Sequence, residues 1–381
     1  MINVRMSLIK TITWGFEKLK SIGVIKDVQH SGKVKLLTQG KSNNLTAIIV
    51  GSYDPSTAAL VEPMTSKRQV DQEYVAQLKN RYIHSNPRPY GFFLAKDVKV
   101  NFKFGVNYCK EGVLIESYCS PSALNNPKYE LPRRLLPFSA VPLSKTHKKG
   151  FILFPAWNHN YYHWMVDILP RLMYLENIDD KTIPIYVGES ISKNAYDALA
   201  IALGDESRVS VLSGTHLFKS AIIPTNISES FDVSKPVISF LRETFASTKV
   251  LKNINQNSLP KKIYISRSDA RLRRIVNEGE IVEMLKKRGF SILTLSSLTV
   301  LEQVALFKNA DIIISHHGAA FTNLVFCSGH THVIEIFQDG HFNPSFYRIA
   351  CNLGLNYSFL VGDKIGYDTY IDTLSLKNLL E

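Results

Sequence analysis

The sequence predicts an α/β protein in which two doubly wound nucleotide-fold domains face each other and a β-rich appendage precedes them. The first observation is length, because 381 residues exceed the usual size of one domain. The second is composition, since 45% hydrophobic and 20% charged residues are typical of a globular protein. The third is a regular alternation of strand-type and helix-type patterns after about residue 150, which indicates parallel sheets with helices on both faces.

These patterns predict four segments along the chain. Residues 1–148 form an amphipathic helix and a loop- and hairpin-rich region, and residues 149–231 form a first α/β domain. Residues 232–250 form a helix between the domains, and residues 251–381 form a second α/β domain. Ligands of doubly wound sheets bind beyond the carboxyl ends of the strands, so we expect a cleft where the two carboxyl edges face each other.

The N-terminal region carries weaker signals than the rest. Residues 1–24 have apolar side chains at helical spacing with basic residues between them. This predicts a basic amphipathic helix, which either lies on an anionic membrane surface or packs on its own domain. Residues 31–85 are rich in turn-forming residues and contain one apolar run, 45–50. Three short β-type runs follow, at residues 91–94, 98–104 and 112–117.

The two α/β blocks have clearer element patterns. In the first block we expect strands at 150–154, 183–187, 209–212 and 219–223, and helices at 161–177 and 192–203. A helix at 232–247, with Pro236 in its first turn, is expected to connect the blocks. In the second block we expect strands at 262–266, 291–295, 311–315, 332–337 and 357–361, and helices at 278–288, 300–309, from about 319, and at 346–353.

The charge of the chain indicates an acidic partner. A formal net charge of +12 is compatible with nucleic acid, an anionic lipid surface or phosphorylated small molecules. Nucleic acid is disfavoured, because the sequence has no zinc-finger, helix-turn-helix or RNP signature and its basic residues are scattered. Phosphorylated small molecules and anionic lipid surfaces therefore remain as the candidate partners.

The cysteines and the apolar runs bear on the compartment. The four cysteines lack CxxC spacing and are too sparse to staple a chain of this length, so we expect reduced thiols. The sequence shows neither a membrane-spanning apolar run nor a signal-peptide core. We therefore expect a cytoplasmic protein, with peripheral contact at the inner face of the membrane if residues 1–24 bind lipid.

A candidate anion site follows the apolar strand at residues 312–315. The strand runs into Ser315-His316-His317-Gly318-Ala319, where small residues open a helix. Free backbone N–H groups and the positive end of the helix dipole favour a phosphate at such a place. His317 could add a donor to that phosphate. The alternative is that Gly318 serves only a tight turn.

Two further charged positions in the second block could contact a nucleotide. Arg267 follows the first strand of that block and is the favoured phosphate ligand, because arginine binds phosphate oxygens in bidentate fashion. Arg271 and its neighbours Arg273 and Arg274 could instead form a solvated loop. Glu335 lies within an apolar strand and needs a partner, either ribose hydroxyls or water at a sheet edge.

In the first block, His163, Asp167 and Arg171 share one helix face at i, i+4 and i+8. An imidazole oriented by a carboxylate suits a general base for a hydroxyl group. Alternatively, His163 is structural and Asp167 pairs with Arg171. A zinc site that adds His159 is disfavoured, since Asn158 and Asn160 suggest a later helix start and an H-E-x-x-H glutamate is absent.

Together these residues resemble glycosyltransferase family 61, which includes bacterial capsular polysaccharide biosynthesis proteins and eukaryotic xylosyl- and N-acetylglucosaminyltransferases. The resemblance covers about residues 150–340, half of the chain. Its motifs are Asn158-His159-Asn160-Tyr161-Tyr162-His163-Trp164, Asp167, Leu169-Pro170-Arg171, Ile265-Ser266-Arg267, His317-Gly318-Ala319, Asn323 and Glu335.

The resemblance implies a GT-B architecture, with the nucleotide-sugar donor bound by the C-terminal domain and the acceptor approached from the N-terminal domain. It also implies inversion at the anomeric carbon without an obligatory metal or other cofactor. It places His163 with Asp167 near the acceptor and Glu335 near the ribose. His316 departs from the family, which more often has a small residue or proline there, and with Arg171 and Arg271 it is a secondary candidate. The positions implied near the diphosphate are Arg267, His317, Gly318, Ala319 and Asn323.

The sequence therefore predicts an inverting glycosyltransferase that moves a sugar from a nucleotide donor to a glycan or lipid-linked glycan acceptor, in capsule or surface polysaccharide synthesis. One alternative is a nucleotide-sugar epimerase or dehydrogenase, which is weakened because no G-x-G-x-x-G follows any predicted strand. The other is a binding module that holds nucleotide sugars without turnover.

Overall fold

The computed structural model describes residues 45–53, 60–65, 69–80, 88–102, 106–109, 112–114, 143–153, 160–189, 191–228, 232–270 and 272–381. The chain divides into two compact units. The second unit, Phe231–Glu381, also includes Asp54–Pro87, and the remainder of the chain forms the first unit. The predicted helix at residues 1–24 lies outside the described residues, as do His159 and Arg271.

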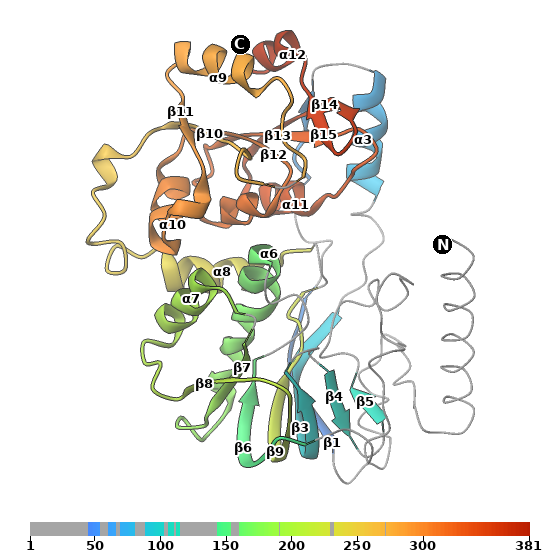
Figure 1. Ribbon diagram of the computed structural model, residues 1–381, viewed down its shortest axis with the longest axis vertical. Coiled ribbons are helices and arrows are strands. Elements are labelled where there is room, and N and C mark those ends of the chain that lie inside the picture. The colour runs from blue at the N-terminus through green and yellow to red at the C-terminus, as the bar shows by residue number, and fades with distance from the viewer. Residues whose placement is uncertain are drawn as a thin grey trace, which may run out of the picture. The chain divides into compact units, whose positions relative to one another are not determined.

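The first unit is built on an eight-stranded mixed sheet (Figure 1). Its spatial order is β5-β4-β3-β9-β6-β7-β8, and β1 pairs with β3. The neighbouring pairs β9–β6, β6–β7 and β7–β8 are parallel, whereas β3 is antiparallel to both β9 and β1. The strands are β1 (Leu45–Tyr53), β3 (Arg88–Asn101), β4 (Val106–Cys109), β5 (Gly112–Leu114), β6 (Lys145–Ile152), β7 (Ile185–Gly188), β8 (Val209–Leu212) and β9 (Thr215–Pro224).

The strands before residue 148 do not form the separate appendage that the sequence suggested. Strand β3 pairs with β9, and β1, β4 and β5 extend the sheet beyond β3. These strands therefore continue the sheet of the first α/β block and make it mixed rather than parallel. The two predicted runs at 91–94 and 98–104 belong to the single strand β3. Between the two runs Asp97 adopts a positive φ of 51° within the strand, a conformation that aspartate tolerates better than most residues.

The helical connections of the first unit carry recognisable start and stop signals. Residues 161–177 form three consecutive helical segments, α6 (Tyr161–His163), a π-helical turn η3 (Trp164–Ile168) and a 3₁₀ segment η4 (Leu169–Asn177). Pro170 lies in the first turn of η4 and lacks the N–H that an α-helix would need there. Helix α7 (Lys193–Leu203) begins at Ser192, whose side chain accepts from the Ala195 N–H.

The second unit is built on a largely parallel sheet with the order β11-β10-β12-β13-β14-β15. The strands and helices that periodicity predicted for residues 232–361 are found close to their predicted ranges, and several shorter elements of the unit had no counterpart in the prediction. The strands are β10 (Lys262–Ile265), β11 (Ser291–Leu293), β12 (Ile312–His316), β13 (His332–Gln338), β14 (Asn356–Ile365) and the antiparallel β15 (Asp368–Tyr370), and β2 (Met64–Thr65) pairs with β14. The helices are α8 (Lys235–Phe245), η5 (Gln256–Ser258), α9 (Glu278–Lys287), η6 (Leu295–Ser297), α10 (Val300–Asn309), η7 (Ala319–Phe326), α11 (Ser345–Leu353) and α12 (Thr373–Asn378).

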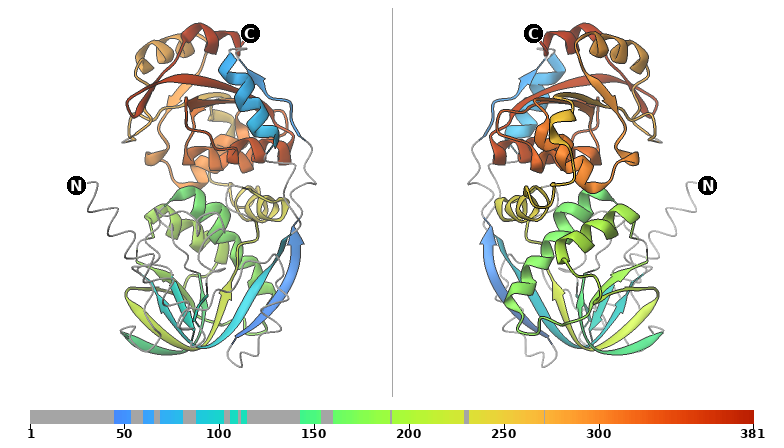
Figure 2. Two further views of the ribbon diagram at one scale, coloured as in Figure 1. Left: turned by 90° about the vertical axis from the view of Figure 1, so that its right-hand side faces the viewer. Right: turned by 90° about the vertical axis from the view of Figure 1, so that its left-hand side faces the viewer.

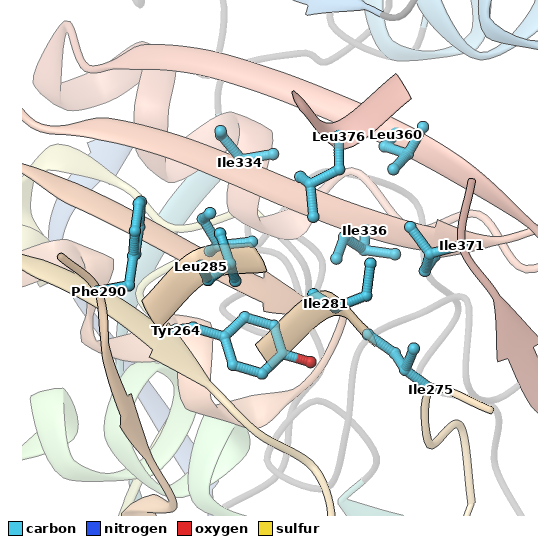
Figure 3. Packing of buried hydrophobic residues seen from close by; sticks show 11 residues of the cluster. Tyr264, Ile275, Ile281, Leu285, Phe290, Ile334, Ile336, Leu360, Ile371 and Leu376 are labelled. Carbon is cyan, nitrogen blue, oxygen red and sulfur yellow. The ribbon is translucent and has the colours of Figure 1, made fainter. Parts of the chain in front are cut away.

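Helices cover both faces of this sheet. Helices α9 and α12 lie on one face, and α10 and α11 lie on the other (Figure 1). Ile281 and Leu285 of α9 pack with Leu376 of α12 onto isoleucines of the central strands (Figure 3). Because strands buried on both faces need apolar side chains on both, β12 and β13 read as continuous hydrophobic runs in the sequence.

The strand order positions the candidate site. In chain order the five parallel strands lie as 2-1-3-4-5, so the direction of winding reverses between β10 and β12. Ligands of open α/β sheets bind outside the carboxyl ends of the strands at this reversal. In the second unit those two ends carry Arg267 after β10 and His317 after β12.

A helix that the sequence patterns did not reveal belongs to the second unit. Helix α3 (Gln69–Asn80) lies between β1 and β3 in the sequence but packs beside β14 (Figure 2). Its Tyr74 is buried against Phe337, Phe342 and Phe359. No helix in the described ranges is long and apolar enough to cross a membrane.

Candidate functional site

In the first unit the structure brings together two of the predicted residues, His163 and Asp167. His163 ends α6 and Asp167 lies in the π-helical turn that follows. The His163 Nδ1 and Asp167 Oδ2 atoms are 2.6 Å apart, and both side chains are largely buried. The π-helical turn is closed by the Leu169 N–H, which donates to the Trp164 carbonyl. Such turns often occur at functional sites, and here the turn contains the carboxylate that orients the imidazole.

Arg171, a secondary candidate for the site, forms hydrogen bonds that hold the fold together. Its guanidinium donates to the backbone carbonyl of Asp167 at 2.8 Å, to the carbonyl of Pro224 at 3.0 Å and to the side chain of Asn226. It is 2% exposed. Arg171 therefore ties the helix to the end of β9, and the carboxylate of Asp167 is bonded to His163.

In the second unit, Arg267 lies directly over Gly318. Arg267 Nε donates to the Arg273 carbonyl and Nη2 donates to the Leu272 carbonyl, both at 3.2 Å. A Cβ atom on Gly318 would fall well inside van der Waals contact with Nη1 of Arg267. Gly318 has an extended φ of 176°, so glycine is required here for space and not for its backbone freedom. An arginine in this position after β10 thus requires a glycine at position 318 after β12.

The charges at this place are positive and incompletely balanced. Burial, followed by repulsion from Arg273, lowers the pKa of the Arg267 guanidinium, and only Asp269 opposes this effect. Burial also lowers the pKa of Arg273, whose Nη1 lies 2.9 Å from His341 Nε2. Among the described residues, neither arginine forms an ion pair with a carboxylate. An anion bound here would relieve both desolvated charges.

The two adjacent histidines have different surroundings. His316 is buried, with Nε2 2.8 Å from Thr369 Oγ1 and Nδ1 3.4 Å from the His317 carbonyl. His317 Nδ1 lies 2.5 Å from Glu335 Oε1, and its ring stacks on Phe337. Burial lowers the pKa of each imidazole to about 3, with the nearby arginines adding to the shift. His316 is bonded within the fold, so His317 is the histidine suited to a ligand.

Glu335 occupies a buried position that differs from the alternative of a water-facing residue at a sheet edge. It is fully buried on β13, which lies between β12 and β14 and is not an edge strand. One carboxylate oxygen contacts His317 and the other accepts from Tyr357 Oη at 2.6 Å. Glu335 is therefore not an edge residue facing water, and its direct contacts are with His317 and Tyr357.

The helix that starts at Ala319 presents two kinds of residue. Ala319 and Ala320 are partly exposed, and the first N–H groups of a helix have no partner within it. Asn323, predicted to lie near a diphosphate, is fully buried; its Nδ2 donates to Gln303 Oε1 at 3.0 Å and to the Ala320 carbonyl at 3.2 Å. Asn323 thus fastens η7 to α10, and the backbone at Ala319 is the part that can meet a ligand.

Sequence reasoning missed several residues of this site. Arg273 was not preferred over a solvated loop in the sequence patterns, yet its guanidinium lies among Arg267, His316 and His341. Arg273 has a positive φ of 60° and its N–H donates to the Tyr367 carbonyl at 3.0 Å. His341 follows the carboxyl end of β13 and could have been found by the same strand-end rule that identified Arg267. Tyr357 and Thr369 had no local signal, because both act through contacts distant in sequence.

The described residues contain no group of three or more histidine, cysteine, aspartate or glutamate side chains placed to hold a metal ion. What this site offers a ligand is two guanidiniums, an imidazole and the N-terminus of η7. Groups of this kind match phosphate oxygens.

Comparison with known proteins agrees with this chemistry. Residues 161–334 match the family Glycosyltransferase 61, and the match contains His163, Asp167, Arg267 and Gly318. No curated protein matches the chain. The resemblance drawn from the sequence motifs is confirmed by the family match. Residues 161–334 of this chain are therefore similar to glycosyltransferase family 61.

Proposed function

We propose that this protein is a glycosyltransferase that binds the diphosphate of a nucleotide sugar at the carboxyl ends of β10 and β12, and that it transfers the sugar with inversion. The observation that carries the proposal is the guanidinium of Arg267 seated over Gly318 beside Arg273. Preorganised positive groups of this kind stabilise the charge that develops on a leaving nucleoside diphosphate. The proposal includes a GT-B architecture, in which the second unit is the donor-binding domain.

In this proposal His163 is the general base. Inversion requires one displacement, in which the acceptor oxygen forms a bond to the anomeric carbon while the bond to the diphosphate oxygen breaks. The acceptor hydroxyl loses its proton to His163, and Asp167, bonded to Nδ1 at 2.6 Å, holds the imidazole so that Nε2 can accept it. The leaving group departs with the electron pair and is stabilised by Arg267, Arg273 and the N-terminus of η7.

Several finer features belong to the same proposal. The acceptor is a glycan or a lipid-linked glycan, and the product contributes to capsule or another surface polysaccharide. The reaction takes place in the cytoplasm, with residues 1–24 as a candidate contact to an anionic membrane. The enzyme uses no metal or further cofactor, because the guanidiniums carry the charge stabilisation that a divalent cation supplies elsewhere.

The test uses two variants of the full chain and a panel of nucleotide sugars, first ranked by thermal shift, since a ligand at 100 times its Kd adds about 2.7 kcal/mol of stability. Arg267→Gln should weaken binding of the best donor by about 10- to 100-fold, because a hydrogen bond to a charged group contributes roughly 1.5–3 kcal/mol. His163→Ala should leave that binding unchanged and slow turnover by about 100-fold. Arg274→Gln is the matched control, because Arg274 shares the loop but is exposed and paired with Asp368.

The assay measures free nucleoside diphosphate with and without acceptor, in EDTA and in manganese. Unchanged donor affinity in Arg267→Gln would contradict the donor site. If His163→Ala lowers the melting temperature but keeps its turnover per folded molecule, the histidine is structural and Asp167 becomes the candidate base. Tight binding of a donor without acceptor-dependent release would show a binding module, and activity lost in EDTA and restored by manganese would show a metal-dependent enzyme.

A further inference from the structure

The support of His317 is built from buried groups on the three central strands of the second unit. His317 follows β12, Glu335 lies on β13 and Tyr357 lies on β14. Tyr357 Oη donates to Glu335 Oε2 at 2.6 Å, and Glu335 Oε1 lies 2.5 Å from His317 Nδ1. Phe337 stacks on the imidazole, and Phe346 packs against it with ring centroids 5.0 Å apart. The ring is therefore fixed with Nδ1 toward Glu335 and Nε2 turned away from it.

The hydrogen bond at Nδ1 decides what Nε2 can do. The pair of Glu335 and His317 can hold one extra proton, beyond those of an ionised carboxylate and a neutral imidazole. If that proton is on Glu335, the carboxyl donates to Nδ1 and the neutral ring carries its own proton on Nε2. If the proton is on His317, the imidazolium carries protons on both nitrogens. Nε2 is an N–H donor in either case, so the conclusion does not depend on which residue holds the proton.

Loss of that one proton reverses the character of Nε2. The remaining ring proton then lies on Nδ1, where it donates to the carboxylate, and Nε2 becomes an acceptor. An acceptor cannot bond to a phosphate oxygen. The donor capacity of Nε2 is thus controlled by a proton buried beneath it.

The surroundings favour retention of the proton at neutral pH. Burial raises the pKa of Glu335 to about 8, and the hydrogen bond from Tyr357 opposes that rise. Burial and the charges of Arg273 and Arg267 disfavour an imidazolium. The remaining groups that face His317 are the ring of His341, with centroids 5.6 Å apart, and the adjacent His316. Burial lowers the pKa of His341 to about 4, so neither of these two imidazoles adds positive charge at neutral pH.

We propose that Glu335 and Tyr357 are positioning residues that keep an N–H on Nε2 of His317, and that this N–H donates to a phosphate of the nucleotide sugar. The inference rests on the proposed donor site and goes beyond it, because it assigns Glu335 to the support of His317 instead of to the ribose. The two roles predict opposite responses to pH. If Glu335 accepted hydrogen bonds from ribose hydroxyls, donor affinity would rise as the carboxyl group deprotonates. If Glu335 positions His317, donor affinity falls when the shared proton is lost, because Nε2 then no longer carries an N–H.

The test measures binding of UDP-glucose and GDP-mannose by calorimetry from about pH 6 to about pH 10. These probes are chosen because a phosphate in a diester lacks the second ionisation near pH 6 that a phosphate monoester has. In the wild-type protein, affinity should fall by about 10- to 100-fold as the pH rises past about 8, the range expected for loss of a charge-assisted hydrogen bond. Glu335→Gln should bind about as well at pH 7 and show no alkaline loss, because the amide donates to Nδ1 at every pH.

Tyr357→Phe provides a second, independent variant. It removes the hydrogen bond that favours the carboxylate, so the alkaline loss should move to higher pH. Tyr264→Phe is its matched control, since Tyr264 is also a buried tyrosine on this sheet and donates to Glu278 at 2.8 Å. Glu302→Gln is the control for Glu335→Gln, because Glu302 caps α10. Both controls should keep the wild-type pH profile.

Nitrogen-15 NMR of labelled histidine separates this inference from the donor site itself. Without nucleotide, the ring proton of His317 should lie on Nε2 at pH 7 and on Nδ1 above about pH 8. In Glu335→Gln the proton should stay on Nε2 over the same pH range. Donor affinity that is flat or rises with pH, or alkaline loss that persists in Glu335→Gln, overturns the positioning role. If neither probe binds at any pH while the NMR transition is present, the support of His317 stands and the donor assignment fails.

Discussion

At the scale of single residues, the close approach of Arg267 to Gly318 links two strand ends. The guanidinium occupies the volume that any larger residue at position 318 would need. Its Nε and Nη2 atoms donate to the carbonyls of residues 273 and 272. The same side chain thus holds the loop after β10 and packs against the turn after β12. A substitution at Gly318 should therefore act through Arg267.

We expect Gly318→Ala to weaken nucleotide-sugar binding by about tenfold or more with little loss of stability, because the obstacle is the end of a flexible side chain. In the Arg267→Gln background the same substitution should have little further effect. The coupling between the two positions is measured by a double-mutant cycle on donor Kd. Gly329→Ala is the control, since its Cβ would meet nothing closer than 3.7 Å. Additive losses in the double variant would show that Gly318 acts independently of Arg267.

At the scale of elements, helix α10 shows how local signals define a boundary. Thr299 accepts from the Glu302 N–H at 3.3 Å, and Glu302 Oε2 accepts from the Thr299 N–H at 2.7 Å. This capping box satisfies two backbone donors that a helix start leaves free. Asn323 of η7 then bonds to Gln303 of the same helix, so a boundary set by local contacts helps to place the segment that follows Gly318.

Thr299→Ala should lower the free energy of unfolding by about 1 kcal/mol, the usual contribution of an N-cap side chain. Thr294→Ala is the matched control, because Thr294 precedes η6 without a side-chain cap, and it should change stability by less than about 0.5 kcal/mol. Both are measured by urea unfolding.

The pH dependence of the same variant is a second readout. Hydrogen bonds from Thr299 lower the pKa of Glu302 in the folded state. A lowered pKa contributes stability above the unfolded pKa, and this stability is lost as the pH falls through the folded pKa. The difference in free energy of unfolding between wild type and Thr299→Ala should therefore become smaller at acidic pH. A difference that stays constant down to about pH 3 would show that the Thr299 hydroxyl does not contribute to the lowered pKa of Glu302.

At the scale of the whole molecule, the chain enters the second unit twice. The segment with β2 and α3 leaves the first sheet after β1 and returns to it at β3. In the second unit, Tyr74 accepts from the Gly340 N–H at 2.9 Å and lies 3.5 Å from the Gln338 carbonyl. Residues 338–341 carry His341, which contacts Arg273. An insertion from the N-terminal region thus supports a loop at the candidate donor site.

Tyr74→Phe should destabilise the second unit by about 0.5–1.5 kcal/mol, because the hydrogen bond between the Gly340 N–H and the Tyr74 hydroxyl is lost. The Gly340 amide should also exchange its hydrogen faster in the native state. Hydrogen exchange and thermal unfolding of the full chain measure both effects. Tyr367→Phe is the control, since Tyr367 is 78% exposed. Equal protection of Gly340 in the variant and the wild type would show that the loop keeps its conformation without the hydrogen bond to Tyr74.

The sequence alone determined most elements of the α/β core of the second unit, from β10 to β14, and the strand ends at which its candidate site lies. Strands β12 and β13 and helix α10 lie at or within one or two residues of the predicted ranges, because period, caps and turns are local properties. Arg267 and His317 could be named as neighbours for the same reason. Each follows a parallel strand, and the carboxyl ends of parallel strands lie at one edge of a sheet. His163 and Asp167 were paired by helical spacing alone.

Only the tertiary structure decided where the N-terminal strands pair, which unit α3 joins and which way the buried polar side chains turn. Glu335 and Asn323 have the residue types of ligand-binding groups, yet one supports His317 and the other bonds to Gln303. Arg273 has the pattern of a solvated loop, yet it lies beside the buried histidines. These outcomes depend on contacts between residues far apart in the chain. Burial makes an unpaired polar group costly, and which partner satisfies it is decided only when distant strands come together.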